Sequence, residues 1–294
     1  MRVSEAPVRA GRGIAPMLAA ATAWGLLGPV ARFAMEDGVG PVAVALGRSV
    51  VAGAAFGLHA AITRPRRPPA RDAAAMLLFG ATGLAGMWAA FLVSVQAGGA
   101  TLAAILLYTG PVWVGAVSWA LGRERVSLRT LGALLLTVAG VATVVWSPGA
   151  EIPSPRPLAL WSGLAAGMLF ATHFLLAAPL VRRHGGATVF AYALPAAAVV
   201  LLPFSRLAVP SPTALLAILF VGVASTYLAS LFFAWAVAHL SGIQAAVAAT
   251  WEPVMAALAA AALWGERLHG IQAAGAVLVI AGVLLASGAR QGEN

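Results

Sequence analysis

The sequence predicts an all-α integral membrane protein whose ten transmembrane helices form two inverted five-helix repeats. Of the 294 residues, 61% are hydrophobic and only 9% are charged, whereas a soluble domain carries roughly 25% charged residues. The apolar residues run continuously over about 20 positions at a time, as in membrane-spanning helices and unlike the alternating strands of a membrane barrel. A set of short motifs also occurs twice along the chain.

The duplication is visible in motifs that return at a constant offset. The pairs are residues 110–112 (Gly-Pro-Val) with 252–254 (Glu-Pro-Val), Glu124 with Glu266, and Gly140 with Gly282. The offset is 142 in each case (253 − 111, 266 − 124 and 282 − 140). We therefore expect residues 1–150 to form the first repeat and residues 151–294 the second, joined by a short proline-containing connection.

Apolar stretches bounded by Pro, Gly or Arg give five spans in each half. We expect the first five at Ile14–Ala34, Val42–Ile62, Ala73–Val95, Thr101–Leu121 and Leu128–Trp146. We expect the second five at Leu158–Val181, Ala187–Phe204, Thr213–Ala238, Gly242–Leu263 and Ile271–Ser287. The arginines before the first span resemble those of a signal peptide. That span is too long for a signal peptide and nine more follow, so we interpret it as a retained helix.

Arginines concentrate in alternate connections between the spans. The connections after spans two, four and six contain Arg64, Arg66, Arg67, Arg71, Arg123, Arg125, Arg129, Arg182 and Arg183. The other connections contain fewer arginines and several acidic residues. By the positive-inside rule this asymmetry predicts a cell (inner) membrane protein with both termini in the cytoplasm. Because each half has an odd number of spans, the second half enters the membrane from the opposite side, so the repeats are inverted.

The composition also limits the chemistry that the chain can perform. There is no Cys, and we find no HExxH, GxSxG or Walker motif, so we expect no metal, no cofactor and no catalytic constellation. The formal net charge is +9, but the basic residues lie in short connections, as topogenic charge does, and so do not indicate nucleic acid. The expected partners are the lipid bilayer and a small-molecule substrate, and a monomer is plausible.

Glu252 is the strongest single candidate for a functional residue. It lies deep in the ninth span, where an ionisable side chain is costly unless it faces water, pairs or takes up a proton. Proton uptake would let Glu252 couple proton movement to substrate movement; the alternative is an ion pair that only fixes helix packing. Pro111 and Pro253 occupy matched positions near the midpoints of spans four and nine. There they should bend the helices, either at the wall of a cavity or as packing kinks.

Other polar and aromatic residues should lie at membrane depth. Arg48, in the second span, can bind a carboxylate or pair with an acidic residue. We expect a substrate cavity to include Trp24, Trp88, Gln96, Tyr108, Pro111, His173, Tyr227, Ser230, Gln244, Thr250, Trp251, Glu252 and Pro253. Such a lining suits amphipathic or aromatic solutes, and core packing is the alternative for each aromatic ring. Glu124 and Glu266, at the ends of spans four and nine, are candidate clasps or gating residues. Arg48 and Glu252 are candidates for coupling or gating.

The chain resembles the EamA-type carriers of the drug/metabolite transporter superfamily. The residues that carry the resemblance are Trp24-Gly25, Arg48, residues 108–112, 122–125 and 139–141, and in the second half residues 252–254, 265–267 and 281–283. The first repeat departs from the usual Gly-Glu pair by inserting Arg123. The resemblance implies a central cavity lined by helices one, three, four, six, eight and nine. It also implies export of small metabolites, often amino acids or amphipathic compounds.

The sequence thus predicts a transporter rather than an enzyme, which exports small metabolites such as amino acids and aromatic or amphipathic compounds by alternating access of the two repeats. Proton-coupled antiport and passive facilitated exchange both fit. An intramembrane or lipid-modifying enzyme is the alternative, with Glu252 and His173 as its candidate pair. An aqueous channel is disfavoured by the bulky apolar lining.

Overall fold

All elements in the described part of the chain are helical. The computed structural model describes residues 10–123, 127–146, 156–206, 209–267 and 269–287. Within these residues ten helical spans are long and apolar enough to cross a membrane, from Arg12–Glu36 to Gly270–Ser287. Each begins and ends within three residues of the span expected from the sequence. The predicted fold class of ten transmembrane helices is confirmed.

Four spans are built around one uninterrupted α-helix each. These are α3 (Pro41–Thr63), α8 (Leu128–Val145), α11 (Gly186–Leu201, which ends in the short 3-10 helix η3, Leu202–Phe204) and α16 (Gly270–Ser287).

The other six spans are interrupted. Span one consists of α1 (Ala10–Gly25) and α2 (Leu27–Glu36), and span four of α6 (Ala100–Leu107) and α7 (Gly110–Ala120). Span nine consists of α14 (Gly242–Ala249) and α15 (Glu252–Trp264). Spans three, six and eight contain π-helical segments. Span three consists of α4 (Ala70–Phe79), η1 (Gly80–Gly86) and α5 (Met87–Gly98), and span six of α9 (Pro157–Thr172), η2 (His173–Ala177) and α10 (Ala178–His184). Span eight consists of α12 (Pro212–Gly222), η4 (Val223–Leu228) and α13 (Ala229–Val237).

The connections are short because the caps are encoded locally. Ser127 and Ser211 accept hydrogen bonds from the backbone amides of Thr130 and Ala214 and so begin α8 and α12. Gly99 and Gly185 each join two helices as a single residue with φ of 85° and 78°. A side chain disfavours this region of φ, so glycine is the residue that permits such abrupt reversals.

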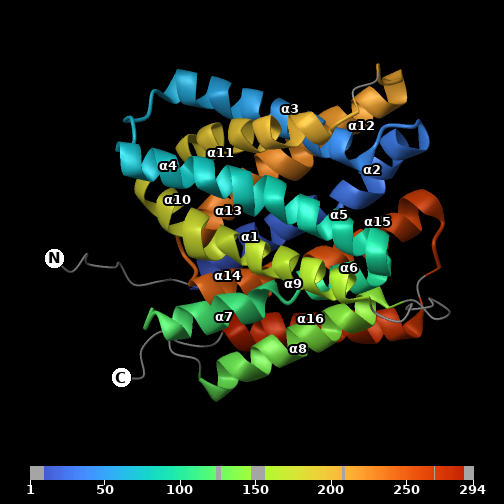
Figure 1. The fold of residues 1–294 in the computed structure, drawn as a ribbon. Coiled ribbons are helices and arrows are strands. Elements are labelled where there is room, and N and C mark those ends of the chain that lie inside the picture. Colours follow the sequence, from blue (N-terminus) through green and yellow to red (C-terminus); the bar gives the residue numbers. More distant parts are fainter. Residues whose placement is uncertain (1–9, 124–126, 147–155, 207–208, 268, 288–294) are drawn as a thin grey trace.

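Alternate connections lie on the same face of the molecule. Near the arginine-rich connections, Asp72 binds His184, and Arg182 donates to the carbonyl oxygens of Val237 and Leu240. We call this end, where α4 begins and α10 ends, the arginine-rich face; it is at the left of Figure 1. On the opposite face, to the right, Ser211 donates a hydrogen bond to Asp37. The helices therefore run between the two faces in alternating directions, as two inverted five-helix repeats require.

Large apolar side chains cover the outside of the bundle, as contact with lipid demands. Examples that are more than 60% exposed are Leu58, Ile62, Leu135, Val199, Leu216, Val277 and Leu284. They lie on the continuous spans α3, α8, α11 and α16 and on α12, which form the top and bottom edges of the bundle in Figure 1.

The last helices of the two repeats, α8 and α16, pack against each other through glycines (Figure 1). A Cβ built on Gly140 would lie 2.8 Å from the carbonyl oxygen of Gly275, and one built on Gly275 would lie 2.7 Å from the carbonyl oxygen of Gly140. Each glycine thus receives the backbone of the partner helix. Such close approach between small residues is a main source of helix association in membranes.

We predict that Gly275→Ala destabilises the protein although alanine is the better helix former. The added methyl group would meet backbone atoms that cannot rotate away, and overpacking of this kind costs about 1–3 kcal/mol. Gly57→Ala is the matched control, because a Cβ at Gly57 meets no atom within 4 Å. The melting temperature of the detergent-purified protein should fall for Gly275→Ala and hold or rise for Gly57→Ala. Equal melting temperatures would contradict the tight contact.

Candidate functional site

The six interrupted spans are one, three and four in the first repeat and six, eight and nine in the second. These are equivalent positions, because each repeat contributes its first, third and fourth helix. Backbone groups freed by a helix interruption are tolerated at membrane depth only where protein or a cavity meets them. The shared pattern therefore marks the centre of the molecule as the place to look for a site.

The predicted bends at the two matched prolines are confirmed as breaks. The α-helix stops at Tyr108–Thr109 and again at Thr250–Trp251, and Pro111 and Pro253 lie in the first turn of the helix that follows. Because the first turn of a helix has no internal acceptor for its amides, proline is well placed there.

Two glycines at the equivalent repeat position pack against these breaks. A Cβ built on Gly25 would lie 2.6 Å from the carbonyl oxygen of Glu252, and one built on Gly167 would lie 2.6 Å from the carbonyl oxygen of Leu106. The two glycines are 142 residues apart, like the motifs (167 − 25). The first helix of each repeat thus supports the broken helix of the other repeat.

A cavity of about 80 Å³ lies where the interrupted spans meet. It is lined by Trp24, Leu27, Arg48, Ser49, Leu84, Met87, Trp88, Phe170, His173, Phe190, Leu194, Leu201, Ser225, Thr226, Ser230 and Glu252. All three π-helical segments contribute, and π-helical turns recur at functional sites in proteins. The lining differs from the expected one, because spans two and seven contribute residues and span four does not.

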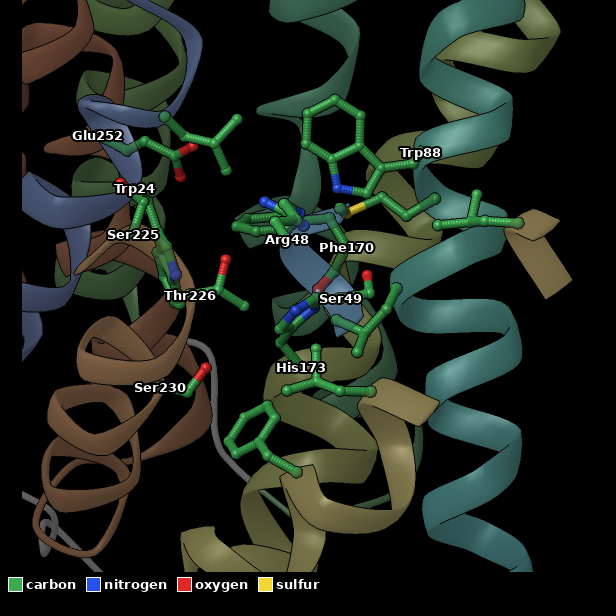
Figure 2. A pocket seen from close by; sticks show the side chains of 16 residues that line it. Trp24, Arg48, Ser49, Trp88, Phe170, His173, Ser225, Thr226, Ser230 and Glu252 are labelled. Carbon is green, nitrogen blue, oxygen red and sulfur yellow. Dashed lines mark hydrogen bonds between the residues drawn. The ribbon is translucent and has the colours of Figure 1, made fainter. Parts of the chain in front are cut away.

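Arg48 is buried and projects into the cavity. Its guanidinium lies over the ring of Trp88, with 4.8 Å between the central carbon and the ring centroid. In Figure 2, Glu252 and Trp24 lie on one side of the cavity and Trp88 on the other, with Arg48 between them. Arg48 has no salt bridge within 4 Å to a described residue, and its buried Nε has no hydrogen-bond partner. The Trp88 Nε1 and the Ser225 hydroxyl are likewise buried without a partner among the residues that the structure describes.

Glu252 is the first residue of α15 and is half-buried against the cavity. The amides of the first turn and the helix dipole favour its negative charge. Arg48 acts on it electrostatically, and the Tyr108 side chain approaches its carboxylate. The cavity therefore contains one cation and one anion that are not joined as an ion pair.

Aromatic rings form another part of the wall. His173 packs edge-on against Phe79 at 5.0 Å and against Trp24 at 6.4 Å between ring centroids. Its Nδ1 lies 3.1 Å from the carbonyl oxygen of Phe170, which only accepts hydrogen bonds. The Nδ1 atom therefore carries a proton, and in the neutral ring Nε2 is left as an acceptor.

Glu252 has no acidic counterpart at the equivalent position of the first repeat. Its equivalent is Gly110, where an added Cβ would lie 2.6 Å from the ring of Phe170. The equivalent of Phe170 is Gly28, where an added Cβ would meet no atom within 4 Å. The first repeat thus has a glycine under the ring of Phe170 where the second repeat has the Glu252 carboxylate, and an open glycine at position 28 where the second repeat has that ring.

Six of the predicted residues line the cavity: Trp24, Arg48, Trp88, His173, Ser230 and Glu252. Four others are not among the lining residues: the Tyr108 side chain approaches the Glu252 carboxylate, the Trp251 Nε1 donates to Thr22, and Pro111 and Pro253 are buried in the first turns after the breaks. Thr250 bonds the carbonyl oxygen of Val247 within its own helix.

Three predicted cavity residues lie elsewhere. Gln96 is exposed near the end of α5, and the Tyr227 hydroxyl bonds His59 at 2.9 Å, outside the cavity lining. Gln244 forms a capping box with Ser241 and donates to the carbonyl oxygen of Ala286. Glu266, predicted as a clasp or gating residue at the end of span nine, lies at the opposite face, 3.1 Å from Arg32.

The prediction for Glu124 falls outside the described residues. Ser49, Ser225, Phe170 and Phe190 line the cavity but were not predicted. The spacing of Phe170 three residues before His173, on the same helix face, was a usable signal for that ring.

The opposite face is held together by a clasp around Arg32. Its guanidinium bonds Glu36 and Glu266 at 3.1 Å each and lies 4.2 Å from the ring centroid of Trp264. The Trp264 Nε1 donates to the carbonyl oxygen of Pro29 at 2.9 Å. The clasp ties α2, which follows the break in span one, to the end of α15.

Comparison with known proteins gives a consistent family. The model of the EamA-like transporter family matches residues 11–146 and again residues 157–288. A probable terminal-alkyne amino-acid exporter of Streptantibioticus cattleyicolor is 29% identical, with 89% of each chain covered. An uncharacterized transporter of Archaeoglobus fulgidus is 29% identical over 67% of this chain and 71% of its own length.

A further relative is an uncharacterized inner membrane transporter of Salmonella typhimurium, 25% identical over 74% of each chain. A solved crystal structure superimposes with a TM-score of 0.79 at 18% identity, covering 94% of this chain and 96% of its own. That similarity supports the fold.

We predict that Gln244→Ala weakens folding without altering the cavity. Its loss would remove one half of the capping box and the bond to Ala286, at a cost of about 1 kcal/mol. The melting temperature should fall, while the KM of the purified transporter for its substrate stays within twofold of wild type. A changed KM with an unchanged melting temperature would return Gln244 to the binding site.

Proposed function

The chain belongs to the EamA-like transporter family, and from this premise we propose that it exports α-amino acids with apolar or aromatic side chains by alternating access. Family membership and ten membrane-spanning helices make it a multi-pass membrane transporter. The amino-acid substrate is our inference from the cavity. One observation carries it: Arg48 and Glu252 line the same cavity without forming an ion pair.

An amino acid has the complementary pair of charges. Its carboxylate fits the guanidinium of Arg48, which can donate two parallel hydrogen bonds. Its ammonium fits the carboxylate of Glu252. The orphaned donors of Trp88 and Ser225 offer further contacts to the carboxylate, because buried donors without a partner are costly and a ligand that pairs them is favoured.

The aromatic wall suits an apolar side chain. Trp24, Phe170 and Phe190 line the cavity beside the two charges, and apolar walls with a few placed polar groups are typical of small-molecule sites. The relative from Streptantibioticus cattleyicolor, named a probable exporter of a terminal-alkyne amino acid, supports this class of substrate.

The size of the cavity supports a moving mechanism. Its volume of about 80 Å³ is well below the roughly 300–1,000 Å³ of ordinary ligand sites. We propose that the bundle opens to admit substrate, and that the Arg32 clasp on one face and the Asp72–His184 contact on the other release in turn. In this proposal the positive-inside rule assigns the arginine-rich face to the cytoplasmic side of the inner membrane.

Glu252 gives the cycle a means of coupling to protons. A proton and a substrate ammonium would compete for the same carboxylate, so only one would be carried at a time. Mutually exclusive occupancy of one site by two cations is the requirement for antiport. Inward proton movement would then drive outward movement of the amino acid.

We predict that Arg48→Gln removes recognition of the carboxylate. In proteoliposomes measured by counterflow, the wild type should prefer labelled phenylalanine over phenylalaninamide, which lacks the carboxylate. Loss of a charged hydrogen bond of about 1.5–3 kcal/mol should erase roughly ten- to hundredfold of that preference. Arg206→Gln, an exposed arginine of the opposite face, is the control and should retain it. A variant that keeps the wild-type preference would refute this role for Arg48.

We predict that Glu252→Gln uncouples transport from the pH gradient. Phenylalanine export by the wild type should rise when an inwardly directed proton gradient is imposed, because protonation of Glu252 releases the ammonium. In the variant the flux should not respond to the gradient, although counterflow without a gradient should persist at reduced affinity. A gradient response equal to that of the wild type would remove Glu252 from coupling. The recovered solute should be chemically unaltered, whereas an enzyme would convert it.

A further inference from the structure

A second recess lies at the arginine-rich face, away from the central cavity. It has a volume of about 590 Å³ and is lined by Arg66, Arg67, Pro68, Pro69, Arg183 and His184. The first four of these residues belong to the connection between α3 and α4, in the first repeat. The last two are at the end of α10, in the second repeat. The recess therefore bridges the two repeats, at the left of Figure 1.

The recess is strongly basic. The carboxylate of Asp72 is already engaged, 2.6 Å from His184 and 3.8 Å from Arg183. Among the described residues no carboxylate lies within 4 Å of Arg66 or Arg67. Three arginines against one aspartate leave a net charge of +2 with His184 neutral (3 − 1). Guanidinium groups gathered in this way match the oxygens of a phosphate group.

The recess is held in place by its own sequence. Arg66 and Arg67 are flanked by Pro65 and by the pair Pro68-Pro69. Because proline fixes φ, this connection loses little further freedom when its arginines bind a ligand. On the other wall, His184 is half-buried and fixed by its contact with Asp72 at the start of α4. The site thus exists before a ligand arrives.

The position of the recess identifies the source of the phosphate. It lies at the ends of membrane-spanning helices, at the level where lipid headgroups are found. Immediately before this connection in the chain, the last two turns of α3 expose Leu58 and Ile62 by 64% and 72%. These two side chains are four residues apart and share one face of the helix, which offers an apolar path for an acyl chain. Basic pockets between transmembrane helices are suited to anionic headgroups.

We propose that this recess binds the phosphate of an anionic phospholipid and thereby links the two repeats at the arginine-rich face. The lipid bridges Arg66 and Arg67 of one repeat to Arg183 of the other. Because alternating access moves the repeats relative to each other, such a bridge favours the arrangement in which the two walls are close. The proposal concerns a site separate from the transport cavity and stands without the proposed substrate.

The test is native mass spectrometry of the full chain, purified in detergent and titrated with phosphatidylglycerol or phosphatidylcholine. The wild type should retain phosphatidylglycerol preferentially. Arg67→Gln should weaken that retention about fivefold, and Arg66→Gln with Arg67→Gln together by roughly tenfold or more. Arg12→Gln is the matched control, since Arg12 is also exposed and belongs to the helix that packs against Leu240 at the same face; it should change retention less than twofold. Melting temperatures equal to wild type would show that the variants are folded.

The arms distinguish the sources of phosphate. If millimolar inorganic phosphate leaves the lipid adduct intact, the lipid assignment is supported. If phosphate displaces the lipid from the wild type and also binds to the lipid-free protein, the recess is a site for soluble phosphate compounds. The lipid assignment is then overturned. Equal phosphatidylglycerol retention by wild type and the double variant, or an equal loss in Arg12→Gln, would overturn the site itself. Neither result bears on amino-acid transport by the central cavity.

Discussion

The structure depends on the requirement that every backbone polar group in a bilayer find its partner inside the protein. Continuous helices meet this requirement on their own, and α3, α8, α11 and α16 do so where the bundle faces lipid. Interrupted helices meet it less regularly: the amides of Thr109 and Trp251 bond the carbonyl three residues back instead of four, and three spans contain π-helical segments, which contribute to the central cavity. A helical membrane protein that needs polar chemistry at its centre is therefore driven to this division between regular outer and irregular inner helices.

Much of this arrangement could be predicted from the sequence, because bilayer thickness and hydropathy fix where spans begin and end. The matched positions of Pro111 and Pro253 likewise located the two breaks. The π-helical segments could not be predicted, because Gly80–Gly86 and Val223–Leu228 contain no proline and no local pattern in the sequence marks their wider turns. They bring Leu84, Ser225 and Thr226 to the cavity, which is why part of the lining was missed.

The predicted site residues that lie away from the cavity share a physical feature. Gln244 and Tyr227 are polar groups at membrane depth, and in the absence of coordinates such groups suggest a substrate path. The structure satisfies them internally, through a capping box and through His59. The Ser-x-x-Gln spacing of residues 241–244 was a readable capping signal, whereas the partner of Tyr227 is 168 residues away and no local pattern reveals it. Arg48 and Glu252 differ because no ion pair within the described residues neutralises either of them.

The two halves are chemically unlike although their backbones are related. Gly110 stands where the second repeat has Glu252, and Gly28 stands where it has Phe170. Two identical halves would present the same groups to both ends of a bound molecule, so a dipolar passenger could sit head first or tail first with equal energy. With a cation from span two, and with Glu252 and Phe170 replaced by glycines at the equivalent positions of the first repeat, one pose is lower in energy than its reverse. A passenger of the proposed kind would then travel with a fixed heading and would not have to tumble inside the cavity.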